Sequence, residues 1–314
     1  MNVINTETHD LSANVATVKI QDFAKALNLN IVFEGRGEMV ISSISISRPG
    51  LQLTGYFSYF DNDRIQLVGR PENSYLVSMD SQEREKNLDI LFSKNIPCLI
   101  VTDNLEVMPE ILKYAKKYNC PLFTSKQIAA VVTHELTIYQ GELIAPTIVM
   151  HGVFVEVFGV GVLITGHAGV GKSETALELI TRGHRLVSDD SVVIKNMGES
   201  LVCKAPENIR HFMEVRGIGI INVQTMFGPG AIRLLKTVDI VVDLAKWEEG
   251  KSYERLGDVK QTQTILGIEL PKHTIPVSPG RNIPVIIETA ARKYRLDQMG
   301  YDATQELINK TFKQ

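Results

Sequence analysis

The stretch Gly166-His-Ala-Gly-Val-Gly-Lys-Ser173 fits the phosphate-loop pattern GxxxxGK[ST] at every specified position. Glycines in such a loop let backbone N–H groups turn inward toward phosphate oxygens, and the following helix directs its positive end at the same anion. The lysine of the pattern reaches the outer phosphates, and the serine hydroxyl binds Mg²⁺. The apolar run 161–165 predicts a strand before the loop, and residues 173–182 predict a helix after it. This context favours a working phosphate site over a chance glycine turn.

Two adjacent acids follow the apolar Leu186-Val187, and the second of them lies eighteen residues beyond Lys172 (190 − 172 = 18). A carboxylate at a strand end near a phosphate loop is where an acid that organises Mg²⁺ is expected. Asp189 and Asp190 also permit a division of labour, with one acid beside the metal and the other close to a nucleophile. A simple loop or helix cap is the alternative, because aspartate is common in both.

Composition and charge exclude several classes of protein. Lys and Arg number 33 and Asp and Glu 36, a net charge of −3, and 44% of residues are apolar and 22% charged. This balance argues against a disordered chain and against nucleic-acid binding through bulk positive charge. No apolar run approaches the ~18–20 residues of a membrane helix, and the first residues do not resemble a signal peptide. Three widely spaced cysteines, without a CxxC pair, predict buried reduced thiols. We therefore expect a soluble cytoplasmic protein.

The length of 314 residues exceeds the ~100–200 residues of one typical domain, which predicts two domains. Short helical and extended patterns alternate over the first part, including an extended run at 53–57, and indicate a small α/β domain at 1–130. We place the boundary at a predicted helix capped by Thr124 or Ser125, with Ile128, Val131, Val132 and Leu136 on one face. Its scattered polar residues indicate no function. The phosphate loop then belongs to a second domain, 131–314, with a mixed sheet wrapped by helices.

Other stretches carry little information alone. The segment 213–222 combines Glu214 and Arg216 with two glycines and a β-branched run, and is equally typical of a salt-bridged strand. His151 by itself is more often a satisfied core or surface residue, and Arg255 is typical of a surface ion pair. The segment 276–281 contains two prolines and a glycine.

Taken together and in this order, these stretches resemble the HPr kinase/phosphorylase family of bacterial carbon catabolite repression. The resemblance covers roughly residues 145–300. It implies a second domain similar to phosphoenolpyruvate carboxykinase around the phosphate loop. It also implies a serine kinase that phosphorylates the phosphocarrier HPr with ATP or pyrophosphate, and that removes the phosphoryl group with inorganic phosphate, which yields pyrophosphate. Members assemble as homohexamers and use Mg²⁺.

The resemblance also assigns roles to residues. Asp190 is the acid/base, and His151, Lys172 and Arg255 line the active site. Ser173 and Glu214 lie near the metal. Segment 213–222 serves both reactions, whereas 276–281 serves mainly dephosphorylation. The nucleotide or pyrophosphate is held by Gly166, His167, Ala168, Gly169, Val170, Gly171, Lys172 and Ser173.

The implied chemistry is physically consistent with these residues. A serine hydroxyl is a poor nucleophile, so a carboxylate that accepts its proton lowers the barrier, and the same acid returns the proton in the reverse reaction. We hypothesise that Asp190 is a buried carboxylate whose pKa is raised by the neighbouring acid. We also hypothesise that Arg281 helps to hold the attacking phosphate in the reverse reaction.

Three alternatives remain. A GTPase should carry an Asn-Lys-x-Asp motif, which this sequence lacks, and its DxxG at 297–300 lies in a predicted helix far from the loop. Another P-loop small-molecule kinase, or a carboxykinase-like enzyme, is the more serious alternative. A binding module with a degenerate enzyme is disfavoured by the intact Lys172, Ser173 and Asp190.

Overall fold

The computed structural model describes residues 15–247 and 261–312, and its internal contacts divide the chain into two compact units, Met1–Ala145 and Pro146–Gln314. We expected the domain boundary near residue 130, but this residue lies in the first turn of helix α5 (Ala129–Ile144). Val132, Leu136 and Ile144 of this helix are buried in the core of the first unit. The whole helix therefore belongs to the first unit, and the division comes after it.

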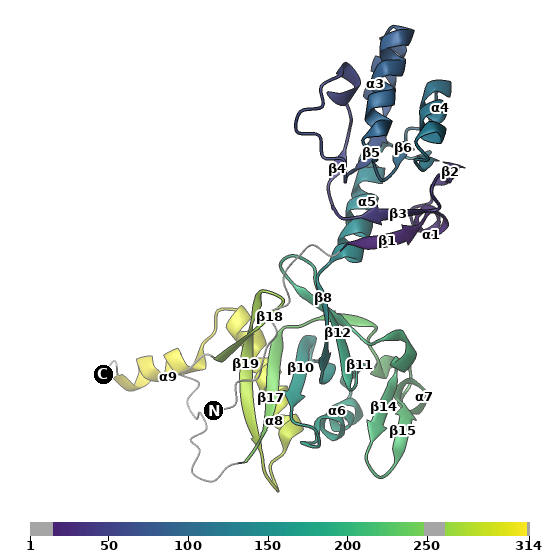
Figure 1. Ribbon diagram of the computed structural model, residues 1–314. Helices are drawn as coiled ribbons and strands as arrows, with labels where there is room; N and C mark the ends of the chain where they lie inside the picture. Colours follow the sequence, from purple (N-terminus) through teal and green to yellow (C-terminus); the bar gives the residue numbers. More distant parts are fainter. Residues whose placement is uncertain (1–14, 248–260, 313–314) are drawn as a thin grey trace, which may run out of the picture. The chain divides into compact units, whose positions relative to one another are not determined.

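The first unit is a three-layer α/β structure (Figure 1). Its five-stranded sheet has the order β2-β7-β6-β5-β4, in which only β2 is antiparallel to its neighbour. Helices α1 and α5 pack on one face of this sheet, and α3 and α4 pack on the other. The elements are β1 (Ala16–Lys19), α1 (Ile20–Ala26), β2 (Asn30–Phe33), β3 (Glu38–Ile41), β4 (Ile46–Ser47), η1 (Gln52–Thr54), β5 (Ile65–Val68), α2 (Arg70–Ser78), α3 (Ser81–Ser93), β6 (Leu99–Val101), α4 (Pro109–Lys117), β7 (Leu122–Thr124) and α5.

The expected strand at 53–57 is wrong. Residues Gln52–Thr54 form a short 3₁₀ turn, η1, that ends at Gly55 with a left-handed φ of 87°. Leu53 is fully buried, and Asn87 of α3 donates a side-chain hydrogen bond of 2.8 Å to the carbonyl of Leu53. Leu53 therefore reaches the core from a turn. An apolar residue can be buried without an extended backbone, so the apolar run did not have to form a strand.

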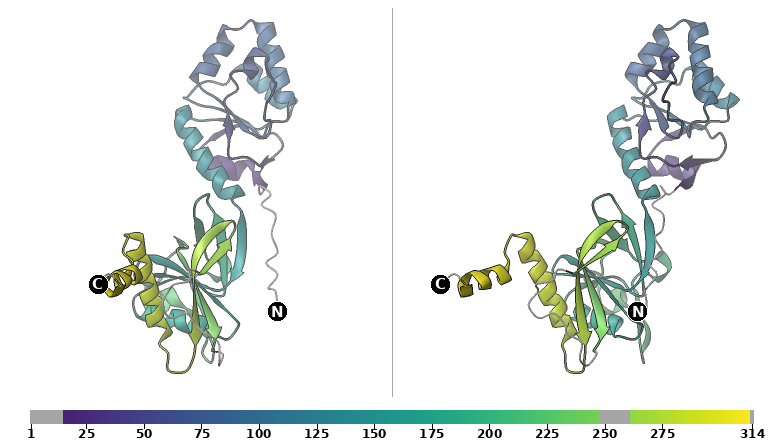
Figure 2. Two further views of the ribbon diagram at one scale, coloured as in Figure 1. Left: turned by 90° about the vertical axis from the view of Figure 1, so that its left-hand side faces the viewer. Right: turned by 60° about the vertical axis from the view of Figure 1, so that its left-hand side comes forward.

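The second unit contains two packed sheets and a helical layer (Figure 1). A six-stranded sheet, β11-β9-β10-β17-β19-β18, is covered on one face by α6 and α8 and on the other by a four-stranded sheet, β16-β13-β12-β8. The chain closes with α9, which extends away from the sheet (Figure 2). The elements are β8 (Thr147–His151), β9 (Val153–Val157), β10 (Val160–Gly166), α6 (Lys172–Thr181), β11 (Arg185–Ser188), β12 (Ser191–Asn196), β13 (Leu201–Lys204), η2 (Glu207–Ile209), β14 (Phe212–Val215), β15 (Gly219–Asn222), α7 (Val223–Phe227), η3 (Pro229–Ala231), β16 (Leu235–Thr237), β17 (Ile240–Lys246), β18 (Gln261–Ile265), β19 (Ile268–Val277), α8 (Ile283–Gln298) and α9 (Ala303–Phe312).

The phosphate loop leaves the middle of the six-stranded sheet. Strand β10 lies between β9 and β17 and is buried on both faces over residues 160–164, which explains its uninterrupted apolar sequence. The loop follows β10 directly, and α6 follows the loop. Ligands of open α/β sheets bind at the carboxyl ends of such strands. The fold therefore places the loop where a ligand site is expected.

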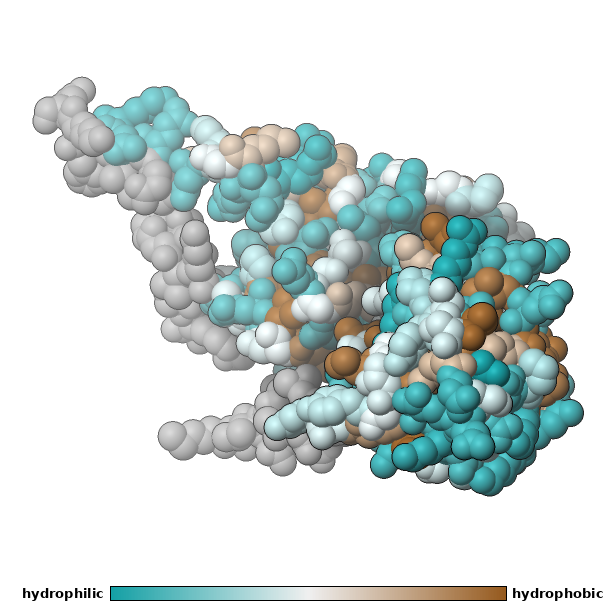
Figure 3. All heavy atoms as spheres, turned by 90° about the horizontal axis from the view of Figure 1, so that it is seen from above, coloured by the Kyte–Doolittle hydropathy of each residue, from teal (hydrophilic) through white to brown (hydrophobic). Residues whose placement is uncertain are grey.

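The state of the cysteines and the polarity of the surface are those expected from the composition. Cys98, Cys120 and Cys203 are free and buried, as expected, and burial raises the pKa of the Cys120 and Cys203 thiols to about 12. Hydrophilic and hydrophobic residues are interspersed on the face shown in Figure 3. In the described part of the chain, no helix has both the length and the apolar character needed to cross a membrane.

Candidate active site

The phosphate loop has the backbone that its glycines predict. Gly166, Gly169 and Gly171 all have positive φ, at 136°, 78° and 99°. A Cβ atom at Gly166 would lie 2.4 Å from the carbonyl oxygen of Leu244 on β17, so no larger residue fits there. The loop ends where α6 begins at Lys172. The positive end of this helix therefore faces the space in which the loop turns.

Lys172 and Ser173 are held by neighbouring groups. The Lys172 side chain is buried, and its Nζ donates to the carbonyls of Gly166 at 3.0 Å and His167 at 3.2 Å. The Ser173 hydroxyl donates to Oδ1 of Asp189 at 2.8 Å, and the backbone N–H of Glu214 donates to Oδ2 of the same carboxylate at 3.2 Å. Burial raises the pKa of Asp189, against the lowering effect of these hydrogen bonds. Asp189 therefore contacts the hydroxyl of the serine that the sequence predicts to lie near a metal ion.

Asp190 lies in the β11–β12 turn beside His151. The Nδ1 atom of His151 is 3.0 Å from Oδ1 of Asp190, and both side chains are more than half exposed, at 56% and 69%. The backbone N–H of Gly152 donates to the carbonyl of Asp190, whose φ of 65° lies in the left-handed region. The hypothesis of a buried carboxylate at position 190 is wrong, because the turn buries Asp189 and directs Asp190 to solvent.

The segment 213–222 forms the β14–β15 hairpin, which lies beside the phosphate loop. Met213, Val215 and Ile221 face the core, so the alternation of the strand directs Glu214 to the opposite face. Glu214 and, in the following turn, Arg216 line the same cleft as the phosphate loop. The hairpin is thus a wall of the site.

One cleft of about 190 Å³ collects most of the predicted residues. Three residues predicted to hold the ligand, Gly166, His167 and Val170, do not line the cleft. Val170 is buried in the core, and the carbonyls of Gly166 and His167 accept hydrogen bonds from Nζ of Lys172. Glu174 and Asp189 are the lining acids that the sequence left without an assigned role, although the place of Asp189 at a strand end next to Asp190 was a usable signal. The lining residues are His151, Val153, Ala168, Gly169, Gly171, Lys172, Ser173, Glu174, Asp189, Asp190, Glu214 and Arg216.

Two predicted parts are not placed at this cleft. Arg255 lies outside the described residues. The segment 276–281 covers the end of β19 and the turn after it, and it does not line the cleft. Nη1 of Arg281 donates instead to the carbonyl of Pro276 at 3.4 Å. The role of this segment stays a prediction.

The oxygen donors in the cleft fit Mg²⁺. Mg²⁺ is usually held by one or two carboxylates together with substrate phosphates. The Ser173 hydroxyl and the Asp189 and Glu214 carboxylates supply such donors, and Ser173 and Asp189 are already in contact. Over residues 15–247 and 261–312, no group of three or more His, Cys, Asp or Glu side chains forms a metal site by itself. Phosphate oxygens of a ligand would therefore have to complete the coordination.

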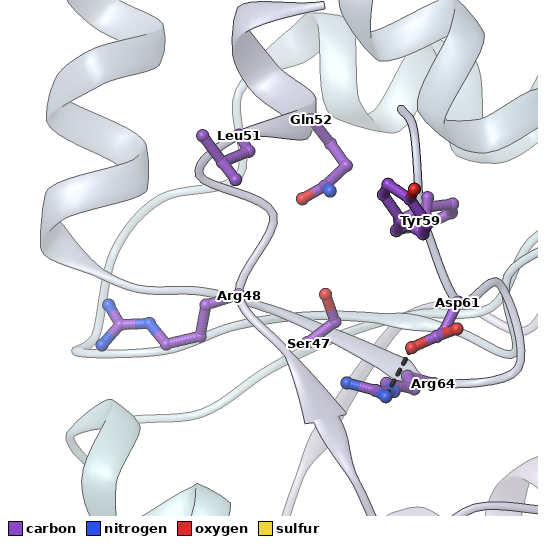
Figure 4. Close-up of a pocket in the computed structure, with 8 residues that line it drawn as sticks. Ser47, Arg48, Leu51, Gln52, Tyr59, Asp61 and Arg64 are labelled. Atoms are coloured by element: carbon purple, nitrogen blue, oxygen red, sulfur yellow. Dashed lines mark ion pairs between the residues drawn. The ribbon is translucent and has the colours of Figure 1, made fainter. Parts of the chain in front are cut away.

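The first unit also has a pocket, of about 240 Å³, lined by polar and aromatic residues (Figure 4). Both arginines at this pocket have carboxylate partners. Arg64 pairs with Asp61, and Arg48 pairs with Glu72 at 2.7 Å. The pocket therefore presents arginine charges that the protein already neutralises. The remaining lining residues are Ser47, Leu51, Gln52, Tyr59 and Phe60.

One cleft combines a phosphate loop at a strand end with a serine hydroxyl, buried and exposed carboxylates, and a histidine. This combination defines a P-loop phosphotransferase. Family models agree: the HPr Serine kinase C-terminal domain matches residues 142–311, and the HPr Serine kinase N terminus matches residues 18–139. The chain belongs to the HPr kinase/phosphorylase family. The kinase/phosphorylase activity and the two-domain α/β architecture expected from the sequence are thereby confirmed at the level of the family.

Curated relatives match over most of their length. HPr kinase/phosphorylase of Alkaliphilus metalliredigens is 47% identical over 88% of this chain and 89% of the relative. The Caldanaerobacter subterraneus protein of the same name is 42% identical over 95% and 98% of the two chains. A solved structure of the Hpr(Ser) kinase/phosphatase from Coxiella burnetii is 37% identical and covers 48% of this chain and 99% of its own, with a TM-score of 0.45.

Proposed function

We propose that this protein transfers a phosphoryl group from ATP or pyrophosphate to a serine of HPr, and that it removes this group with inorganic phosphate. The observation that carries the proposal is one cleft lined by Lys172, Ser173, Asp189 and the Asp190–His151 pair. Lys172, Ser173 and Asp189 suit the binding of a phosphate donor. The Asp190–His151 pair can take the proton of the serine hydroxyl to which the phosphoryl group is transferred. Regulation of carbon catabolite repression is the role that this activity implies.

In the kinase direction, the loop N–H groups and Lys172 hold the donor phosphates. The serine oxygen of HPr attacks the outer phosphorus, the serine O–P bond forms, and the P–O bond to the leaving phosphate breaks. Asp190 accepts the serine proton, while His151 at 3.0 Å orients the Asp190 carboxylate. Ser173, Asp189 and Glu214 would hold Mg²⁺, which would supply positive charge to offset the charge of the phosphates.

The reverse reaction uses the same groups in the opposite order. An oxygen of inorganic phosphate attacks the phosphorus of phosphoserine, so that the new P–O bond yields pyrophosphate. The serine O–P bond breaks, and protonated Asp190 returns a proton to the serine oxygen. The exposure of Asp190 suits this role, because a protein substrate has to reach it from solvent.

The test is incubation of the purified protein with HPr or phosphoserine-HPr and with ATP, pyrophosphate or inorganic phosphate in separate reactions. We expect phosphoserine from ATP and from pyrophosphate, and pyrophosphate from the reverse reaction. Another P-loop small-molecule kinase or a carboxykinase-like enzyme would leave HPr unmodified in every reaction, and that result would reject the proposal.

The resemblance further supports a cytoplasmic homohexamer with closed symmetry. Light scattering should then give a mass several times the 34.9 kDa of one chain. A single-chain mass at micromolar concentration would contradict the assembly.

A further inference from the structure

The loop between η1 and β5 in the first unit presents an aromatic ring on a strained backbone. The ring of Tyr59 is 98% exposed, and its φ of 61° lies in the left-handed region. A bulky residue rarely adopts this backbone, and such strain is typical of ligand sites. Because the ring is almost fully exposed, packing within the described residues does not offset the strain. The strained turn therefore presents the ring to solvent at the edge of the first-unit pocket.

The same pocket keeps its charges paired and its neutral polar groups unpaired. Both of its arginines form ion pairs with carboxylates. The Ser47 hydroxyl and the Gln52 amide, both partly buried, point toward each other across the pocket (Figure 4). Neither side chain has a hydrogen-bond partner in the described part of the chain. A ligand of this pocket therefore meets neutral donors and acceptors, and it does not need a phosphate or another charged group.

A buried acceptor lies on the same face of the sheet. Gln66 on β5 is the register partner of Ser47 on β4, so both side chains lie on one face of the sheet. Gln66 is fully buried, and its Nε2 donates to the carbonyl of Arg64 at 2.8 Å. Its Oε1 has no partner among the described residues, and a buried acceptor without a partner costs free energy. A ligand that carries an N–H donor would supply the missing partner.

The size of the pocket and these three features select the chemistry of the ligand. Sites for whole small molecules have volumes of roughly 300–1,000 Å³. The volume here is about 240 Å³, which suits one ring system. Nucleobases stack on aromatic side chains and form hydrogen bonds through their edges. We infer that this pocket binds an adenine base, which stacks on Tyr59, bonds to Ser47 and Gln52, and directs its amino group toward Gln66. The inference is independent of the proposed function, because it concerns the first unit alone.

The experiment is a calorimetric titration of the full-length protein with adenosine, which lacks the phosphates that the phosphate loop would hold. We expect one site per chain with a Kd of about 10–100 µM. Purine riboside, which differs only by the missing amino group, should bind about tenfold more weakly. Tyr59→Ala should weaken adenosine binding about tenfold or more, whereas Tyr59→Phe keeps the ring and should stay within about threefold.

Two further variants separate binding from a structural role. Tyr56→Ala is the matched control, because Tyr56 is an exposed tyrosine of the same loop that does not line the pocket, and it should bind adenosine like the wild type. Tyr59→Gly removes the ring and also relieves the strain at the left-handed φ. It should therefore lose adenosine binding but unfold at a urea concentration at or above that of the wild type. A tyrosine that served only the fold would instead lose stability.

The inference is overturned if the wild-type protein does not bind adenosine, or if folded Tyr59→Ala binds it as tightly as the wild type. Adenosine binding that persists in Tyr59→Ala but is lost in Lys172→Ala would place the nucleoside at the phosphate loop, and this result also overturns the inference. If Tyr59→Ala does not fold, the two nucleosides decide on the wild-type protein. Equal affinity for adenosine and purine riboside then rejects the amino-group contact and with it the assignment of adenine.

Discussion

The two pockets of this protein differ in how their charges are balanced. The first-unit pocket is larger, at about 240 Å³ against about 190 Å³ for the cleft of the second unit. Each of its arginines is paired with a carboxylate of the same unit. In the cleft, Arg216 has no ion-pair or hydrogen-bond partner within the described residues, and Nζ of Lys172 donates to the loop carbonyls of Gly166 and His167. Because neither cation of the cleft forms an ion pair with a carboxylate of the described residues, both can bind a ligand phosphate, and charge pairing identifies the active site better than volume does.

The largest effect expected from this comparison is that of Lys172→Ala. Its ammonium contributes charge at the phosphates and little core packing, so kinase activity should fall roughly 10³-fold or more. Initial rates of HPr phosphorylation measure this loss. Arg64→Ala, which removes a paired cation of the first-unit pocket, is the matched control and should keep the wild-type rate. Near wild-type activity in a folded Lys172→Ala protein would remove the phosphate-loop assignment.

Asp190→Asn should abolish most of both activities. The amide has the size of the carboxylate but cannot accept the serine proton or return it, so each rate should fall about 10²–10⁴-fold. Paired rates on HPr and phosphoserine-HPr check this prediction. A variant that keeps phosphorylase activity would exclude Asp190 as the shared acid/base.

Asp189→Asn should change how stability depends on pH. Burial raises the pKa of Asp189 above its ordinary value of 3.8, so the folded state binds more protons than the unfolded state over this range. The stabilising contribution of Asp189 is present below pH 3.8 and is lost as the pH rises through the raised pKa. The free energy of unfolding of wild type relative to Asp189→Asn should therefore fall from about pH 4 toward neutrality. Urea unfolding at several pH values tests this, and a difference that grows with pH would contradict it.

The smallest effects on activity are expected in the first-unit pocket. Arg48→Ala leaves the buried Glu72 carboxylate without its guanidinium partner and should lower the free energy of unfolding by about 1–2 kcal/mol. Arg64→Ala breaks a pair whose side chains are 39% and 51% exposed, and should cost below about 0.5 kcal/mol. Both variants should keep the wild-type rate of phosphoryl transfer. A large loss of activity in Arg64→Ala would show that the first-unit pocket also contributes to phosphoryl transfer, although its arginines are paired.

Features set by short stretches of sequence were predictable. The phosphate loop, the strand before it and the helix after it follow from glycine spacing and from a change of apolar period within twenty residues. The strand expected at 161–165 and the helix expected at 173–182 appear in the structure as β10 and α6. In each case the information lies in the backbone preferences of neighbouring residues, which do not depend on the rest of the fold.

Features that depend on distant partners were not predictable. The run at 53–57 became a turn because Leu53 is buried against α3, and α5 joined the first unit because its buried face meets that sheet. Its predicted apolar face was also partly wrong, since Ile128 and Val131 are exposed.

The sequence alone established the family, the phosphate loop and the acid pair, because these are patterns along the chain. Only the tertiary structure decided which acid is buried. Ser173 and the backbone of Glu214 enclose Asp189, while the same turn exposes Asp190 to His151. It also decided which arginine lines the cleft, since Arg216 and Arg281 are equally charged in sequence, but Arg216 lines the cleft and Arg281 donates to the Pro276 carbonyl. Burial and charge pairing are properties of residues brought together from separate segments, so they exist only once the chain has folded.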